Sequence, residues 1–196
     1  MDRETELQLV ERLRAGDLDA FDAVYDAFHA RLYNFLARLS NRRDVAEDLV
    51  EDTWLRLVAH ARKLRPDTRL APWLFTIARN LHVSYCRARL IEDAHSDGLI
   101  GLWPCGLPQP SPLESVEATE VQRRVATALG SLPATYREAL LLVVVEGLSP
   151  SAAADICGVS AECMRQRLSR ARGRLARRLS DAENRGLATL NEVPTS

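Results

Sequence analysis

The chain has 196 residues, of which 46% are hydrophobic and 27% charged, and its formal net charge is −1. These are ordinary values for a folded globular protein and exclude a wholly disordered one. No stretch approaches the roughly 18 apolar residues that a membrane helix needs, and the N-terminus lacks the apolar region of a secretory signal. We therefore expect a cytoplasmic protein that has no contact with a membrane.

A first helical domain is predicted over residues 5–90, where Gly and Pro are almost absent and apolar residues recur at intervals of three and four. Asp17 can cap a helix that begins near Leu18, and Ser40 and Asn41 interrupt the pattern. Further helices are expected over about 44–64 and 72–89. The last of these begins at a proline, which the first turn of a helix favours.

Residues 91–118 predict a linker, because four prolines, three glycines and an excess of acids oppose regular structure there. A second helical domain is predicted over residues 119–180, with helices near 116–129, 133–146, 149–157 and 160–179. Residues 181–196 predict a polar tail that frays. Since no alternating strand pattern occurs, the predicted fold class is all-α, with two small helical domains joined by a Pro-rich linker.

The strongest functional motif lies in residues 148–179, where a short helix, a turn at Gly158 and a longer helix capped by Ser160 match a helix-turn-helix. Residues 165–178 hold seven arginines and no acid, and such local charge suits DNA phosphates even in a nearly neutral chain. The alternative is a solvated basic helix. The apolar stripe of the longer helix consists of Met164, Leu168, Ala171, Leu175 and Leu179.

A second motif is a stripe of carboxylates on the helix expected over about 44–64. At 100° per residue the carboxylates share one arc, and apolar residues occupy the opposite arc, which predicts one buried and one acidic face. The plain interpretation is solubility, and the alternative is a surface that meets a basic protein; a metal site is weakly indicated because no histidine lies near. The stripe consists of Asp44, Glu47, Asp48, Glu51 and Asp52.

A third motif combines a basic loop over residues 60–70 with the aromatic-rich helix that follows. Basic charge beside aromatic side chains suits unstacked bases and phosphates. Trp73 and Tyr85 are expected to belong to the hydrophobic core, and Phe75 has the same plain interpretation, so Asn80 and the loop are the better candidates for contact.

Catalytic motifs are absent from the sequence: there is no Gly-rich phosphate loop, no GxSxG and no HExxH. The four histidines are scattered singly, and the four cysteines form no CxxC or Cys/His cluster. We therefore expect that the protein is not an enzyme and that it has no cofactor and no metal site.

These blocks, in this order, resemble a bacterial extracytoplasmic-function (ECF) sigma factor of the sigma-70 family. The matching segments are DVAEDLVEDTWLRL, PWLFTIARNLHVSYCRAR, a Pro-rich linker, and SLPATYREALLLVVVEGLSPSAAADICGVSAECMRQRLSRARGRL. The resemblance covers about residues 5–178 and implies sigma regions 2 and 4. It implies that core RNA polymerase and promoter DNA are partners, with an anti-sigma factor as a further partner. The first domain would capture the −10 element as a melted strand, and the helix-turn-helix would read the −35 duplex.

Site residues follow from the motifs and the resemblance together. The candidate contacts with core polymerase are Asp44, Glu47, Asp48, Leu49, Glu51, Asp52 and Trp54. The candidate contacts with the −10 strand are Arg62, Lys63, Arg65, Arg69, Thr76, Arg79, Asn80 and Arg87. The candidate contacts with the −35 duplex are Ser160, Arg165, Gln166, Arg167, Ser169, Arg170 and Arg174.

The sequence departs from the family pattern at Glu51-Asp52, at Ser84, in residues 150–154 of the support helix, and at Cys163-Met164. The last two departures bear on the −35 sequence that is read. Two other classes stay open from the residues alone: a helix-turn-helix regulator that binds duplex operator by itself, and a protein-binding adaptor that uses the acidic stripe.

Overall fold

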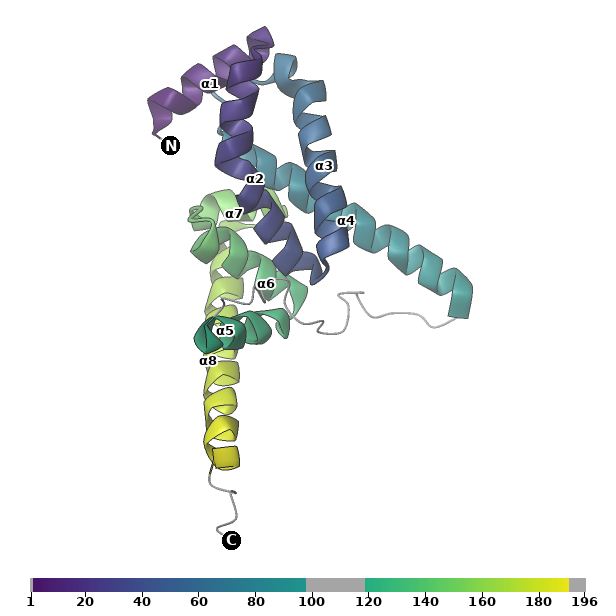
Figure 1. Cartoon of the computed structure of the whole chain (residues 1–196), viewed down its shortest axis with the longest axis vertical. Coiled ribbons are helices and arrows are strands. Elements are labelled where there is room, and N and C mark those ends of the chain that lie inside the picture. Colours follow the sequence, from purple (N-terminus) through teal and green to yellow (C-terminus); the bar gives the residue numbers. More distant parts are fainter. Residues whose placement is uncertain (1, 98–118, 191–196) are drawn as a thin grey trace.

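The structure is a computed structural model that describes residues 2–97 and 119–190, and within these two segments it contains helices and no strand (Figure 1). The predicted all-α fold is confirmed. We call the helices of residues 2–97 the N-terminal group and those of residues 119–190 the C-terminal group. The N-terminal group comprises α1 (Arg3–Ala15), α2 (Leu18–Ser40), α3 (Arg43–His60) and α4 (Leu70–Asp97). The C-terminal group comprises α5 (Glu120–Gly130), α6 (Ala134–Leu140), α7 (Pro150–Cys157) and α8 (Ala161–Leu190).

Local sequence explains where the first helices begin and end. Asp17 accepts hydrogen bonds from the backbone N–H groups of Asp19 (2.9 Å) and Ala20 (3.3 Å), so it caps α2, as predicted. Gly16 ends α1 with a φ of 81°, in the left-handed region that glycine adopts without a steric penalty. Asn41, with a φ of 57°, ends α2 in the same way.

Several predicted helix ends were wrong. The third helix ends at His60 and is followed by one 3₁₀ turn, Ala61–Lys63. Helix α4 begins at Leu70 and continues to Asp97, past the predicted end, because no Gly or Pro interrupts the sequence before residue 98. Helix α8 continues to Leu190 through residues predicted to fray, since good helix formers dominate there. The predicted helix over 133–146 is α6 followed by a π-helix, Leu141–Val145. Residues 98–118 of the predicted linker and 191–196 of the tail lie outside the described residues.

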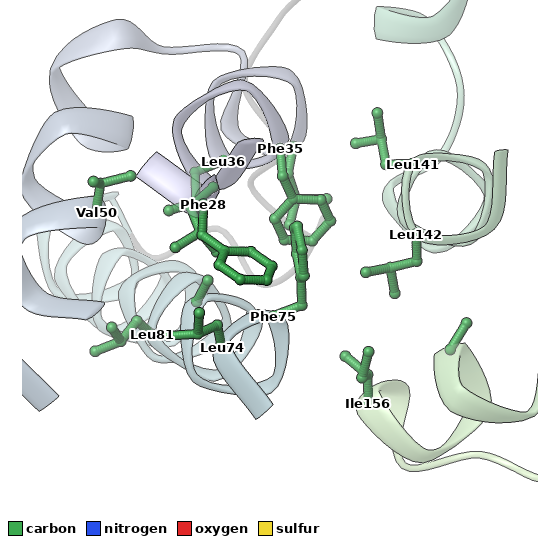
Figure 2. Close-up of a cluster of buried hydrophobic side chains, with 14 of the residues drawn as sticks. Phe28, Phe35, Leu36, Val50, Leu74, Phe75, Leu81, Leu141, Leu142 and Ile156 are labelled. Carbon is green, nitrogen blue, oxygen red and sulfur yellow. The ribbon is translucent and has the colours of Figure 1, made fainter. Parts of the chain in front are cut away.

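The two groups of helices pack against each other through a shared hydrophobic core, which the sequence did not predict. Helix α7 lies against α4, and α6 lies against α2. In Figure 2, Phe35 and Phe75 of the N-terminal group face Leu141, Leu142 and Ile156 of the C-terminal group. The rings of Phe35 and Phe75 meet edge to face, with centroids 5.2 Å apart.

Polar contacts add to this packing at the α2 end. Arg137 of α6 is 2% exposed, and its guanidinium donates to the backbone carbonyls of Arg38 (3.3 Å) and Leu39 (3.1 Å) at the C-terminus of α2. A cation is favourable at that end of a helix, because the last carbonyls carry partial negative charge. The same guanidinium donates to the carbonyls of Gly130 and Leu132 in its own group. Arg137 therefore ties the loop between α5 and α6 to α2.

Candidate nucleic-acid and polymerase-binding surfaces

Helices α7 and α8 form the predicted helix-turn-helix. Ser149 caps α7 by accepting from the N–H of Ala152 (3.1 Å), and Ser160 caps α8 by accepting from the N–H of Cys163 (3.1 Å). Between the helices, Gly158 has a φ of 64°, a backbone conformation that residues with a Cβ rarely adopt. Capping and glycine together set the sharp turn between α7 and α8, which pack against each other.

Helix α8 buries its apolar stripe and exposes its polar faces. Met164, Leu168 and Ala171 are buried against the C-terminal group, while Leu175 and Leu179 are half-buried. Of the candidate −35 residues, Arg167 is half-buried and the others are exposed: Ser160, Arg165, Gln166, Ser169, Arg170 and Arg174. The arginines of residues 170–178 extend the exposed positive surface along the helix. The start of α8 thus offers side chains for base edges, and its later turns offer charge for backbone phosphates.

Three of these candidate residues have side-chain partners within the C-terminal group. Arg165 donates to the carboxylate of Glu162 over 2.6 Å, and this hydrogen bond lowers the pKa of Glu162. Gln166 donates to the same carboxylate over 3.3 Å. The guanidinium of Arg174 lies over the ring of Tyr136, 5.1 Å from its centroid. Arg165 and Gln166 therefore share one carboxylate partner in the free chain.

Helix α3 has the predicted acidic face. All five carboxylates of the stripe are exposed, and the opposite side of the helix is buried, as predicted. Asp44 at the helix start is paired with Arg42, which lowers the pKa of Asp44. Leu55 and Val58, to which the carboxylate pattern did not point, are 66% and 60% exposed within two turns beyond the stripe. The surface therefore joins negative charge to exposed apolar side chains.

Two residues predicted on this surface lie beneath it instead. Leu49 and Trp54 are 6% and 7% exposed, so they hold α3 on the hydrophobic core and leave little area for a partner. The ring of Trp54 packs edge to face on Phe21, and its centroid lies 4.9 Å from that of Tyr25. Its indole N–H donates to Nδ1 of His29 over 3.2 Å. In this structure both residues support α3 from the core, and their predicted contact with core polymerase stays a prediction.

The basic loop before α4 is exposed. Arg62, Lys63, Arg65 and Arg69 all reach solvent, and Arg65 forms an ion pair with Asp67 over 3.0 Å. On α4, Asn80 and Arg87 are exposed, whereas Thr76 is half-buried and donates to the carbonyl of Pro72 over 2.7 Å. Phe75 is fully buried and Trp73 half-buried. The candidate −10 residues thus follow one side of the loop and of α4.

A groove separates this surface from α7 of the helix-turn-helix. Its N-terminal wall includes Arg69, Trp73 and Thr76. Its opposite wall comes from residues 149–156, and includes Ser149, Ser151, Ala152, Asp155 and Ile156. The C-terminal group therefore lies directly beside the candidate −10 residues.

Arg79, a candidate −10 contact, has a partner in the C-terminal group. Its guanidinium pairs with the carboxylate of Glu138 in α6 over 2.9 Å, and the two side chains are only 22% and 8% exposed. Its Nη1 also donates to the side-chain oxygen of Asn80 over 3.4 Å. The C-terminal group covers Arg79 in this structure, and its contact with the −10 strand stays a prediction.

Buried titratable groups lie near this pair. Burial, together with the charges of Arg137 and Arg79, lowers the pKa of His82 to about 4. Burial, and then Glu138, raises the pKa of the Cys157 thiol to about 12. Among the described residues no group of three His, Cys, Asp or Glu could hold a metal ion. No helix in the described segments is long and apolar enough to cross a membrane.

Comparison with known families matches both groups of helices. Residues 24–90 match the family model for sigma-70 region 2, and residues 122–175 match that for sigma-70 region 4. The ECF RNA polymerase sigma factor EcfG of Rhodopseudomonas palustris (strain TIE-1) is 38% identical over 142 residues, which is 72% of this chain and 75% of that protein. The ECF RNA polymerase sigma factor SigM of Bacillus subtilis (strain 168) is 34% identical over 154 residues, which is 79% of this chain and 91% of that protein.

Solved structures match over most of the chain. The sigma factor RpoE of Bartonella quintana, in complex with the anti-sigma factor NepR, has a TM-score of 0.68 at 34% identity. That match covers 82% of this chain and 96% of RpoE. CnrH in complex with the cytosolic domain of CnrY has a TM-score of 0.66 at 24% identity, covers 90% of this chain and 97% of CnrH, and supports the fold alone.

Proposed function

This chain belongs to the extracytoplasmic-function sigma factors of the sigma-70 family, and we propose that it binds core RNA polymerase and directs it to promoters through three separate surfaces. The observation that carries the proposal is helix α8, which buries an apolar stripe and exposes arginines directly after a capped helix-turn-helix. The N-terminal group would serve core polymerase and the −10 element, and the C-terminal group would serve the −35 element.

Helix α8 would read the −35 duplex in the major groove, which is wide enough to admit an α-helix. Arg165, Gln166 and Ser169 lie in its first turns and are exposed, so they can reach base edges. Arg170 and Arg174 lie further along and suit backbone phosphates. Ser160 would place the N-terminus of the helix, where backbone N–H groups favour an anion, close to the DNA.

The acidic face of α3 would bind a basic surface of core polymerase. Exposed carboxylates at 44–52 supply the charge, and Leu55 and Val58 supply apolar area beside it. A patch that combines the two is typical of protein interfaces, where an apolar centre provides affinity and a charged rim guides association. Such an interface explains two large apolar side chains that would otherwise be left in water.

The loop over residues 61–69 and the exposed side of α4 would capture the −10 strand. Basic side chains of the loop would follow the backbone, and the amide of Asn80 can both donate to and accept from a base edge. Because α8 is the helix that suits the major groove, we infer that the N-terminal group reads bases that have left the stack. Unpaired bases would be available only once the promoter has melted.

Further parts of the proposal rest on the family. We infer that the chain divides into a region 2-like domain at 5–90, a linker at 91–118 whose first seven residues continue α4, a region 4-like domain at 119–180 and a tail at 181–196 whose first ten residues continue α8. An anti-sigma factor is a suitable further partner, since the solved relative RpoE is bound by one. The protein would act in the cytoplasm, where polymerase and promoters are found, and would itself catalyse no reaction.

A gel-shift experiment with core polymerase separates the proposal from its alternatives. The full chain, core polymerase and a library of promoter fragments are mixed in all pairs and together. The proposal predicts that a promoter fragment is bound tightly and sequence-selectively only in the mixture that contains both the chain and core polymerase. A helix-turn-helix regulator would bind a fragment tightly without polymerase, and a protein adaptor would bind no DNA in any mixture.

A further inference from the structure

We propose that the free chain rests in a closed state in which the carboxylate of Glu138 occupies the place of a −10 phosphate on Arg79, so that the C-terminal group inhibits strand capture by the N-terminal group. The proposal rests on the proposed function, which assigns the −10 strand to α4. It adds that one guanidinium has two alternative partners, one within the chain and one in the promoter.

The geometry of the pair supports this exchange. Arg79 Nε donates to Glu138 over 2.9 Å, and the Arg79 side chain is 22% exposed beside the exposed Asn80. A carboxylate and a phosphate offer the same kind of charged oxygen acceptor to a guanidinium. Glu138 is only 8% exposed, so it is held by the packing of α6. When the two groups of helices separate, Arg79 becomes available beside Asn80.

The C-terminal group also covers the neighbouring residues. Arg69, Trp73 and Thr76 line a groove whose other wall is α7, from Ser149 to Ile156. A melted strand that crossed this side of α4 would have to pass through the space next to α7. Charge competition at Arg79 and steric crowding along the groove therefore act on the same surface.

Promoter geometry requires the two groups to separate. The −35 and −10 elements lie roughly 25 base pairs apart, or about 85 Å at 3.4 Å per base pair. Helix groups that share a hydrophobic core cannot occupy both elements at once. The arrangement seen here is therefore incompatible with promoter-bound sigma factor.

Two further contacts stabilise the closed state away from Arg79. Arg31 of α2 pairs with Glu146 over 3.0 Å, and Arg137 of α6 binds the C-terminal carbonyls of α2. Only the population of the open state can bind the −10 strand, so the apparent affinity falls by the fraction that is open. Removing a carboxylate from an interdomain ion pair should raise that fraction.

The test measures binding of the full chain to a fluorescein-labelled single strand of about 20 nucleotides and random sequence, by anisotropy. Glu138→Gln should tighten binding about fivefold, the upper range for one partly screened ion pair. Glu11→Gln is the matched control, because Glu11 is an exposed carboxylate on α1 and its loss changes the net charge equally. Equal tightening in both variants would mean a general charge effect and would overturn the proposal.

A second arm asks whether Glu138 acts through Arg79. In an Arg79→Gln background, the further change Glu138→Gln should leave strand binding unchanged within about twofold. Tightening that persists at about fivefold in this background would overturn the exchange. Circular dichroism checks that each variant keeps its helices.

A third arm keeps the closed state testable if Glu138→Gln fails to fold. Glu146→Gln removes the carboxylate that pairs with Arg31, at a contact between the two helix groups away from Arg79. Small-angle X-ray scattering of the free variant should then report a larger radius of gyration than that of wild type. An unchanged radius together with unchanged strand binding would overturn the closed state as an inhibitor. Failure of the proposed function is distinct from these results, because wild type itself would then give no promoter-specific binding with core polymerase.

Discussion

Arg31 of α2 and Glu146, which directly follows the π-helix Leu141–Val145, form an ion pair with 3.0 Å between Nε and Oε2, although 115 residues separate them in the chain. The guanidinium also donates to the backbone carbonyl of Glu146 over 3.2 Å. The side chain of Glu146 is 4% exposed, and burial raises its pKa while Arg31 lowers it. The pair therefore joins the two helix groups at a position where the carboxylate depends on its partner.

The first prediction concerns this pair. Arg31→Ala should lower the free energy of unfolding by about 1–2 kcal/mol, because it leaves a buried carboxylate without its cation. The loss is no larger because Arg31 is partly exposed, so that solvent already screens the ion pair. Chemical denaturation at pH 7 measures it. The double variant Arg31→Ala, Glu146→Gln should recover part of the loss. Additive losses in the double variant would show that the two side chains do not interact.

The second prediction concerns acid stability through His82. Its pKa is lowered to about 4 in the fold, whereas an unfolded histidine titrates near 6.5. The unfolded chain therefore binds more protons between these values, so stability is present above pH 6.5 and falls as the pH drops towards 4. His82→Gln should remove up to about 3 kcal/mol of that fall. Denaturation midpoints of both proteins from pH 7 to 4 measure the difference, and parallel curves would contradict it.

The third prediction concerns the acidic face of α3. Asp48 and Glu51 are exposed, so changing both to Lys reverses the local charge without altering the buried side of the helix. Association with core polymerase should slow, and its salt dependence should weaken, with little change in melting temperature. Surface plasmon resonance over a range of salt concentrations measures the rate. Undiminished association would leave the carboxylates as a solvated face. Asp22→Lys and Asp26→Lys together, on exposed positions of α2, provide a charge-matched control.

The fourth prediction separates two arginines of α8. Arg165→Ala should relax base preference at one −35 position, because a bidentate arginine–guanine contact is worth about 1–3 kcal/mol of discrimination. Arg174→Ala should weaken binding evenly across sequences and reduce its salt dependence, as the loss of a phosphate contact does. Holoenzyme binding to a set of −35 variants measures both effects. Equal and sequence-independent losses in the two variants would refute the assignment.

The fifth prediction concerns the −10 strand. Replacing Lys63, Arg65 and Asn80 together with Ala should impair opening of duplex promoter, because charge for the backbone and an amide for a base edge are lost. A template already melted across −10 should restore part of the opening defect but not the base preference. Run-off transcription from both templates, with each −10 base varied in turn, measures this. Unchanged base preference would assign −10 reading to other residues.

Much of the local structure could be predicted from the sequence, because it depends on near neighbours. Asp17 and Ser160 cap their helices where their side chains predict, and the stripe from Met164 to Ala171 is buried as its spacing indicates. Single-face patterns also identified the exposed carboxylates of α3. These features follow from helical periodicity and capping alone.

Contacts between distant residues could not be predicted in this way. Trp54 looked available on α3, and only the packing of Phe21, Tyr25 and His29 around it shows that it is buried. Arg79 looked like an open DNA contact, and its partner Glu138 lies 59 residues later. Local patterns in a single sequence do not indicate how two groups of helices pack against each other. The closed arrangement therefore could not be predicted from them.

The central claim is that the chain makes core RNA polymerase specific for promoters. Run-off transcription tests it most directly, with core polymerase, the full chain and a linear promoter fragment selected from the genomic source by the reconstituted holoenzyme. The account predicts a single discrete transcript that requires both the chain and intact −35 and −10 elements. With Arg165→Ala, transcription should become less selective for the −35 sequence. Transcription by core polymerase that is the same with and without the chain would contradict it.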